Sequence, residues 1–116
     1  MEVIVSRLAH PVTVESLRRL VDAAYENDLD LAHLLLRIDM PEMVGDMSRG
    51  EYAAELLEHT TNLRSLETGD GVYLDALRED NRHVPVDRLR EGALDTLQVA
   101  VAALLEAGAT ALNRSL

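Results

Sequence analysis

Residues 94–112 read LDTLQVAVAALLEAGATAL, and this stretch decides the fold more than any other. Its apolar and small residues recur at alternating spacings of three and four, the heptad pattern of a helix that packs along one seam. Pro85 or Val86 can open this helix, so the pattern predicts a single long helix over residues 86–113. The seam consists of Leu94, Leu97, Val101, Leu104, Gly108 and Ala111, and Leu105 and Leu112 broaden it.

A helix of this length raises the question of what covers it. It spans roughly 40 Å, about twice the length of any other helix that the sequence predicts. A leucine stripe is usually core of the same chain, but it can also be a contact with a second chain. Shorter helices cannot cover all of it, so we expect its C-terminal part to need a second chain or an N-terminal arm. The residues concerned are Leu104, Leu105, Leu112 and Leu116, and the predicted contact residues of the seam are Leu97, Val101, Leu104 and Leu112.

Shorter amphipathic segments precede the long helix. Ser48 followed by Glu51 is a capping box, the clearest local signal in the chain. Thr13 is the expected N-cap of the first helix, and Asp70 that of the helix before the last. Asn27 or Asp28 is expected to cap the second helix. The periodicity predicts helices over residues 14–26, 29–39, 49–61 and 71–80, with a short helical turn over 41–44 that Gly45 ends.

Two segments are less regular. Residues 62–71 form a connection or a short helix, and residues 2–8 are β-branched and short, so a strand or an extended arm within residues 1–12 is possible. No internal repeat and no low-complexity tract interrupts the chain. The sequence therefore predicts one all-α domain over residues 1–116, a compact bundle of five or six helices with a long C-terminal helix.

Composition agrees with a helical core. The chain has 116 residues, with no Cys, Trp or Phe and only three Tyr, so Leu, Ala, Val and Met must fill the interior. Without cysteine there is no disulfide framework and no thiolate metal site. We see no long unbroken apolar run and no signal peptide, and we expect no membrane partner. All eleven basic residues are Arg, which is typical of a GC-rich genome and suggests a bacterial cytoplasmic protein.

The net charge of −10 is unevenly distributed along the chain. Residues 41–80 hold ten acidic residues and three Arg, a net charge of −7. Such acidity argues against nucleic acid as a partner, because phosphate binding needs positive charge. The acidic segment is either a solvated face or a recognition surface that steers a basic partner. The predicted polar interface residues are the acidic Glu51, Glu55 and Glu58 and the basic Arg78, Arg82, Arg88 and Arg90.

Candidate chemistry is sparse. Asp30 with His33, and Glu55 with His59, have helical spacings that could each supply two metal ligands, but no H-E-x-x-H motif occurs. No serine lies in a G-x-S-x-G motif and there is no cysteine nucleophile. We therefore predict no catalytic, cofactor-binding or metal-binding residue and no enzymatic activity. A metal-dependent helical enzyme using His33, Glu55 and His59 remains an alternative.

Four short Leu-rich stretches follow one another along about residues 15–84, namely Glu15–Tyr25, Asp30–Leu36, Tyr52–His59 and Tyr73–Asn81. In their order they resemble the bacterial effector-associated and death-like domains. This resemblance implies a six-helix bundle that acts as an adaptor through contacts between like domains.

These observations favour a non-enzymatic protein–protein interaction module. We expect a self-associating adaptor in a bacterial signalling or defence system, whose partner is itself, a larger effector, or both. A small acidic inhibitor that mimics nucleic acid and binds a basic protein is the alternative from another class.

Overall fold

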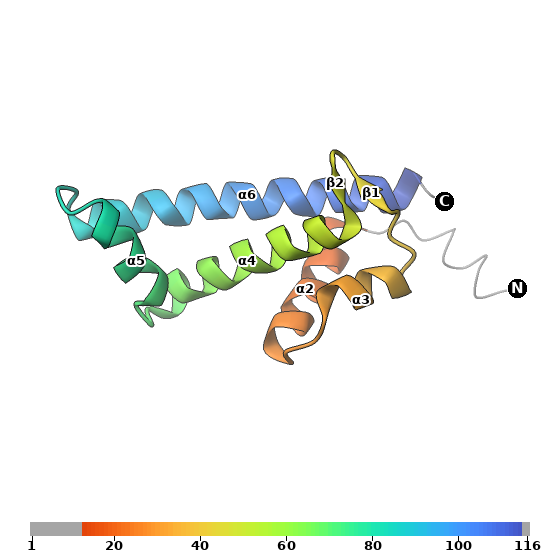
Figure 1. Cartoon of the computed structure of the whole chain (residues 1–116), viewed down its shortest axis with the longest axis horizontal. Coiled ribbons are helices and arrows are strands. Elements are labelled where there is room, and N and C mark those ends of the chain that lie inside the picture. Colours follow the sequence, from red (N-terminus) through yellow and green to blue (C-terminus); the bar gives the residue numbers. More distant parts are fainter. Residues whose placement is uncertain (1–12, 115–116) are drawn as a thin grey trace, which may run out of the picture.

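The computed structural model describes residues 13–114, which form an all-α bundle as predicted (Figure 1). The predicted arm in residues 1–12 lies outside this part of the chain. Two short strands, β1 (Met43–Val44) and β2 (Met47–Ser48), form a hairpin between the second and third of the described helices. The helices are α2 (Val14–Glu26), α3 (Leu31–Arg37), α4 (Arg49–Thr68), α5 (Val72–Asp80) and α6 (Val86–Arg114).

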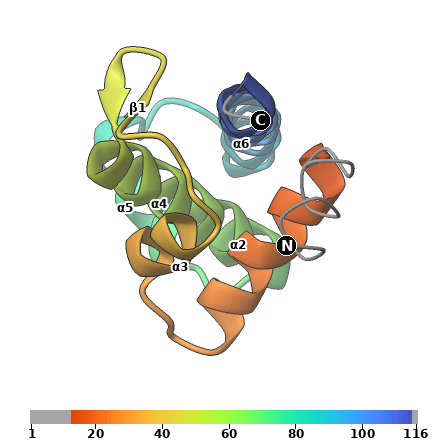
Figure 2. The same ribbon diagram turned by 90° about the vertical axis from the view of Figure 1, so that its right-hand side faces the viewer.

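Helix α4 is the centre of the bundle, because it packs against every other element that the structure describes. Helix α6 lies along α4, and α2 packs against both of them (Figure 2). Helix α3 packs on α2 and α4, and the hairpin contacts α4 and α6. Helix α5 contacts only α4 and α6 among the described elements, and it lies at the opposite end of the bundle from α2 and α3 (Figure 1).

Helices α2 and α4 begin at the residues that the sequence predicts. Thr13 caps α2, and its hydroxyl accepts the backbone N–H of Ser16 at 3.0 Å. Ser48 caps α4 in the predicted capping box, with its hydroxyl accepting the N–H of Glu51 at 3.1 Å. In return, the Glu51 carboxylate accepts the backbone N–H of Ser48 at 3.4 Å. Both caps satisfy amides that a helix N-terminus leaves without partners.

The contact between α4 and α6 is built around Tyr52. Its side chain is fully buried, and its hydroxyl donates to the backbone carbonyl of Leu104 at 2.5 Å. Burial raises the pKa of Tyr52 to about 12, so the phenol stays protonated at neutral pH. The hydroxyl lies over Gly108, where a Cβ atom would be only 2.1 Å from the phenol oxygen. Gly108 therefore lets the two helices approach around a large aromatic side chain.

The buried stripe of α6 differs from the predicted seam. Leu105 and Leu112 are buried, whereas Leu104 and Ala111 are only half-buried. A helix that packs against two neighbours, here α2 and α4, follows its own 3.6-residue period more closely than the heptad of a two-stranded contact. The buried residues of α6 are Leu97, Val101, Leu105, Gly108, Ala109 and Leu112.

The second helix is shorter than the predicted range of 29–39. Its N-cap is Asp30, not Asn27 or Asp28 as predicted, and the Asp30 carboxylate accepts the N–H of Ala32 at 3.1 Å. Asp28 and Asp39 have positive φ angles of 51° and 62°. The left-handed backbone at Asp28, before α3, and at Asp39, after it, does not continue a right-handed helix, so α3 is confined to the residues between them.

The predicted helical turn over residues 41–44 is wrong, because Met43 and Val44 form β1, the first strand of a hairpin with β2. Val44 pairs with Met47, which leaves Gly45 and Asp46 as a two-residue turn. Gly45 has a φ angle of +62°, and tight hairpin turns need such a residue. Gly45, which we expected to end a helix, instead lies in the turn where the chain reverses direction.

Helix α4 extends beyond its predicted end at residue 61. Leu63 and Leu66 continue its apolar stripe and are buried. Most of residues 62–71, which we predicted to be a connection or a short helix, therefore belongs to α4. Gly69, with a φ angle of 75°, ends the helix in a left-handed conformation.

The turn between α4 and α5 is held by Asp70, the predicted cap. Gly71 occupies the N-cap position, and the Asp70 carboxylate accepts the N–H of Val72 at 3.0 Å from one residue earlier. The hydroxyl of Ser65 donates to the same carboxylate at 2.5 Å and accepts the N–H of Tyr73 at 3.2 Å. The hydrogen bond from Ser65, followed by that from Val72, lowers the pKa of Asp70.

Gly108→Ala tests the close approach of α4 and α6. We expect it to lower the free energy of unfolding by about 1–3 kcal/mol, because the added methyl group collides with Tyr52 and Leu17. The matched control is Gly92→Ala on the same helix, where nothing lies within 4 Å of the added carbon. That control should stabilise the helix by about 0.5–1 kcal/mol. Chemical denaturation measures both, and equal effects would contradict the packing described above.

Asp70→Asn tests the turn before α5. Because the pKa of Asp70 is lower in the folded state, its ionised form stabilises the fold above the unfolded pKa of about 3.9, and this contribution is lost as the pH falls through the folded pKa. Wild type should therefore be more stable than the variant at neutral pH, with the difference shrinking in acid. Urea denaturation over a pH series measures it, with Asp46→Asn in the hairpin turn as control. A difference that does not depend on pH would argue against the ionised cap.

Candidate interaction surface

The α5 end of the bundle is poorly buried. None of the residues from Glu67 to Thr96 is buried, although the segment contains several large apolar side chains. Tyr73, Leu74 and Leu77 of α5 are only partly covered by α4 and α6. Val72 is 72% exposed. This exposed apolar surface is a candidate for contact with another molecule.

An apolar groove runs between α5 and α6 at this end, with a volume of about 380 Å³. Arg88 supplies the single charge among its lining residues. The apolar part of the lining consists of Tyr73, Leu77, Val84, Leu89, Ala93 and Leu97.

A second depression of about 370 Å³ adjoins the groove at Val84, which lines both. Val86 also lines it and is 40% exposed. Charges of both signs surround this second depression, from Asp75, Arg78, Glu79 and Arg82. We define the α5–α6 face as the apolar groove, the charged depression and Val72, which lines neither hollow but precedes the groove residue Tyr73 at the start of α5.

The predicted arginine cluster is only partly assembled as a basic patch. Arg78, Arg82 and Arg88 are exposed on the α5–α6 face, but acidic side chains lie between the first two. Arg90 is committed to the fold, because its guanidinium donates to the backbone carbonyl of Leu66 at 2.9 Å. That carbonyl belongs to the last turn of α4, where helical partners run out.

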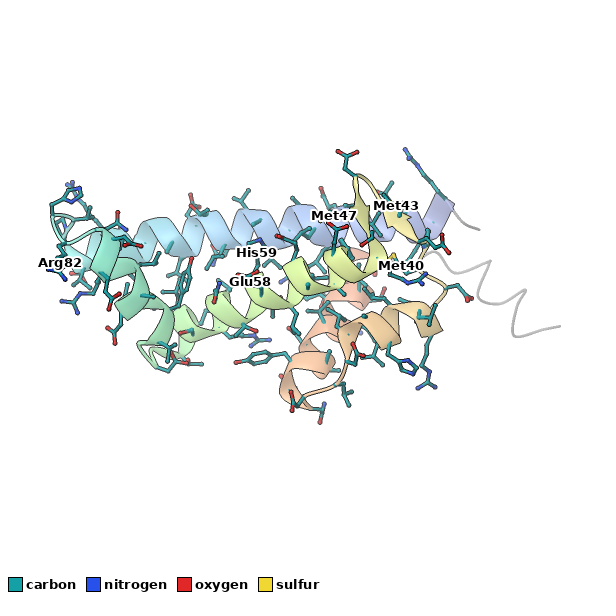
Figure 3. The ribbon with its side chains drawn as sticks, viewed as in Figure 1. Met40, Met43, Met47, Glu58, His59 and Arg82 are labelled. Carbon is teal, nitrogen blue, oxygen red and sulfur yellow. The ribbon has the colours of Figure 1, made fainter. Side chains whose placement is uncertain are left out.

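The predicted acidic residues lie on a different part of the molecule. Glu51, Glu55 and Glu58 are all exposed on α4. Figure 3 shows Glu58 and His59 halfway along this helix and Arg82 at the α5 end. We call these three glutamates the acidic α4 face, which is separate from the α5–α6 face.

The predicted apolar contact residues of α6 serve the core of the chain itself. Leu97, Val101 and Leu112 are each at most 5% exposed, and Leu104 is half-buried. Helix α6 obtains this cover from α2, α4, α5 and β1. The sequence did not show which elements reach the long helix. Within the folded chain these residues therefore pack in the core of the same chain, which is one of the two alternatives that the sequence leaves open.

The candidate metal ligands are not brought together. Glu55 and His59 are close, with 3.1 Å between the carboxylate and Nε2. Nevertheless, within residues 13–114 no three His, Asp or Glu side chains converge in a way that could hold a metal ion. The proposed combination of His33 with Glu55 and His59 is therefore not assembled in this part of the chain.

An ion pair that the sequence does not reveal joins α2 to α4. The guanidinium of Arg64 lies 2.7 Å from the carboxylate of Asp22 and 5.9 Å from the centre of the Tyr25 ring. Its hydrogen bond to Asp22 raises the pKa of Arg64. Because the two charged residues are far apart in the sequence, only the packing of α2 on α4 brings them together. This pair borders a small cleft of about 170 Å³.

Helix α6 is long and apolar enough, by length and composition alone, to cross a membrane. The absence of an unbroken apolar run had led us to expect no such segment. In this structure 28% of the most apolar stretch is buried, and α6 contributes six residues to the core. A core helix of a soluble protein satisfies the same criteria.

Comparison with known proteins gives no relative for this chain. No family model matches it, and neither the curated proteins nor the solved structures contain a significant match. The resemblance to death-like domains therefore rests on the sequence segments alone.

Arg90→Ala tests the structural use of one predicted interface arginine. We expect it to lower the free energy of unfolding by about 1 kcal/mol, because the carbonyl of Leu66 loses a charged donor. Arg88→Ala is the matched control on the same helix and should leave stability within about 0.5 kcal/mol. Thermal or chemical denaturation measures both, and equal losses would contradict the distinction.

Proposed function

We propose that this protein is a non-enzymatic interaction module that self-associates and also binds a further protein, as an adaptor in a bacterial signalling or defence system. One observation carries the proposal, namely the α5–α6 face. Mostly apolar residues line its groove, and no residue from Glu67 to Thr96 is buried. An apolar centre with a polar, charged rim is the usual composition of a protein–protein contact.

The acidic α4 face supports a second contact. Its three glutamates are exposed and lie in the segment of the chain that carries a net charge of −7, from ten acidic residues and three Arg. A surface of one sign attracts and orients a partner of the opposite sign. We propose a basic surface on a larger effector as the target of this face, which gives the module one contact for itself and one for another protein.

The resemblance of the short helices to death-like domains agrees with this proposal, because it implies adaptors that act through contacts between like domains. The compact all-α bundle is compatible with such a role. Fold class alone does not define a function, so the proposal depends on the exposed face.

Val72→Glu tests the proposal. Light scattering behind size-exclusion chromatography of the full chain, over a wide concentration range, should show wild-type self-association. The variant should weaken it roughly tenfold or more, because a charge then enters an apolar contact. The matched control is Val99→Glu on the outer surface of α6, since the two valines are 72% and 64% exposed and neither is part of the core. A wild-type chain that stays monomeric at every concentration would overturn the proposed self-association.

A further inference from the structure

The α5–α6 face has both a hollow and projecting side chains. The groove between α5 and α6 has a volume of about 380 Å³ and is lined mostly by apolar residues. Val72 and Val86, at the starts of the two helices, are 72% and 40% exposed. A surface that carries an apolar hollow and exposed apolar side chains together can be complementary to a second copy of itself.

The charges on this face also favour a second copy. Asp75 and Glu79 alternate along the chain with Arg78 and Arg82, and all four line the depression next to the groove. Away from the two-fold axis itself, a residue of one copy meets a different residue of the partner, and the reciprocal contact follows by symmetry. A face with both signs can therefore pair acid with base twice, whereas a face of one sign would repel its own copy.

We propose that two copies of this chain associate through the α5–α6 face in a closed two-fold dimer, each placing its exposed valines against the groove of the other. This inference rests on the proposed function and specifies the contact. It commits the groove to a second copy, because an acidic or a basic partner would complement only half of the charges on the rim.

The symmetry has a consequence for assembly. A two-fold contact uses the same surface on both chains and closes at two subunits, whereas an acidic α4 face docking on a basic α5 end would leave free faces and propagate. In the closed dimer, Glu51, Glu55 and Glu58 lie outside the contact region as defined by its lining residues. Both acidic α4 faces would then be available for a further protein.

A charge exchange tests the two-fold contact. One variant, Asp75→Arg with Glu79→Arg, carries only positive charges among these four positions, and the other, Arg78→Glu with Arg82→Glu, carries only negative ones. Each variant alone should dimerise roughly a hundredfold more weakly than wild type, because like charges then meet twice. Mixed in equal amounts, the two should form a one-to-one dimer, which native mass spectrometry identifies by mass.

The matched control is Glu55→Arg with Glu58→Arg, which changes the net charge as much as the positive variant but lies on the acidic α4 face. It should dimerise at least as well as wild type. Equal weakening by this control would assign the effect to overall charge and overturn the proposed contact. Failure of the two charge-exchange variants to form a mixed dimer would also overturn it.

Gly92→Arg provides a test that leaves the sequence of α5 unchanged. Gly92 lines the groove on α6, and no atom lies within 4 Å of an added Cβ, so the substitution is compatible with the folded chain. The arginine should fill the groove and abolish dimerisation, with an unchanged circular dichroism spectrum. Retained dimerisation would overturn the two-fold contact. A wild-type assembly larger than a dimer would overturn the closed symmetry but leave self-association intact, whereas a monomeric wild type would remove both proposals.

Discussion

The contact of Tyr52 with the backbone of α6 is the constraint on which the rest of the bundle depends. A buried phenol that donates to the Leu104 carbonyl fixes both the distance between α4 and α6 and their alignment along the axis. The chain tolerates so large a side chain there only because Gly108 has no Cβ atom. Since α4 contacts every other described element, the position of α6 against α4 also determines where α2, α5 and the hairpin can pack.

This arrangement divides the molecule into two unequal ends. Around Tyr52, helices α2 and α3 add their apolar stripes to α4, and α2 also reaches α6, so the core is closed on several sides. Beyond Leu66 and Leu97 only α5 remains to cover the last turns of α4 and the start of α6, and no residue there is buried. The free energy available from burying the apolar side chains of α5 is therefore only partly used within the chain. That imbalance connects the packing of the core to the proposed association.

Charge and packing act at different places on this protein. The glutamates of α4 are exposed on a helix whose opposite side is core, although Glu51 also caps the helix and Glu55 lies 3.1 Å from His59. The arginines near α5 have different uses: Arg90 satisfies the end of α4, while Arg78 and Arg82 alternate with acids. A count of charges along the sequence groups all the arginines together, because it cannot show which guanidinium reaches a carbonyl.

By itself the sequence determined the helical class, the long C-terminal helix and the capped starts of α2 and α4, because these depend on local periodicity and on side chains within one turn of each other. It located the acidic helix correctly, and it missed the hairpin at Gly45 and the continuation of α4. Only the tertiary structure decided which side of α6 is buried, since that depends on the two helices it faces. Tertiary packing also decided that α5 would be half-covered, because burial depends on how many neighbours reach an element and not on its own pattern.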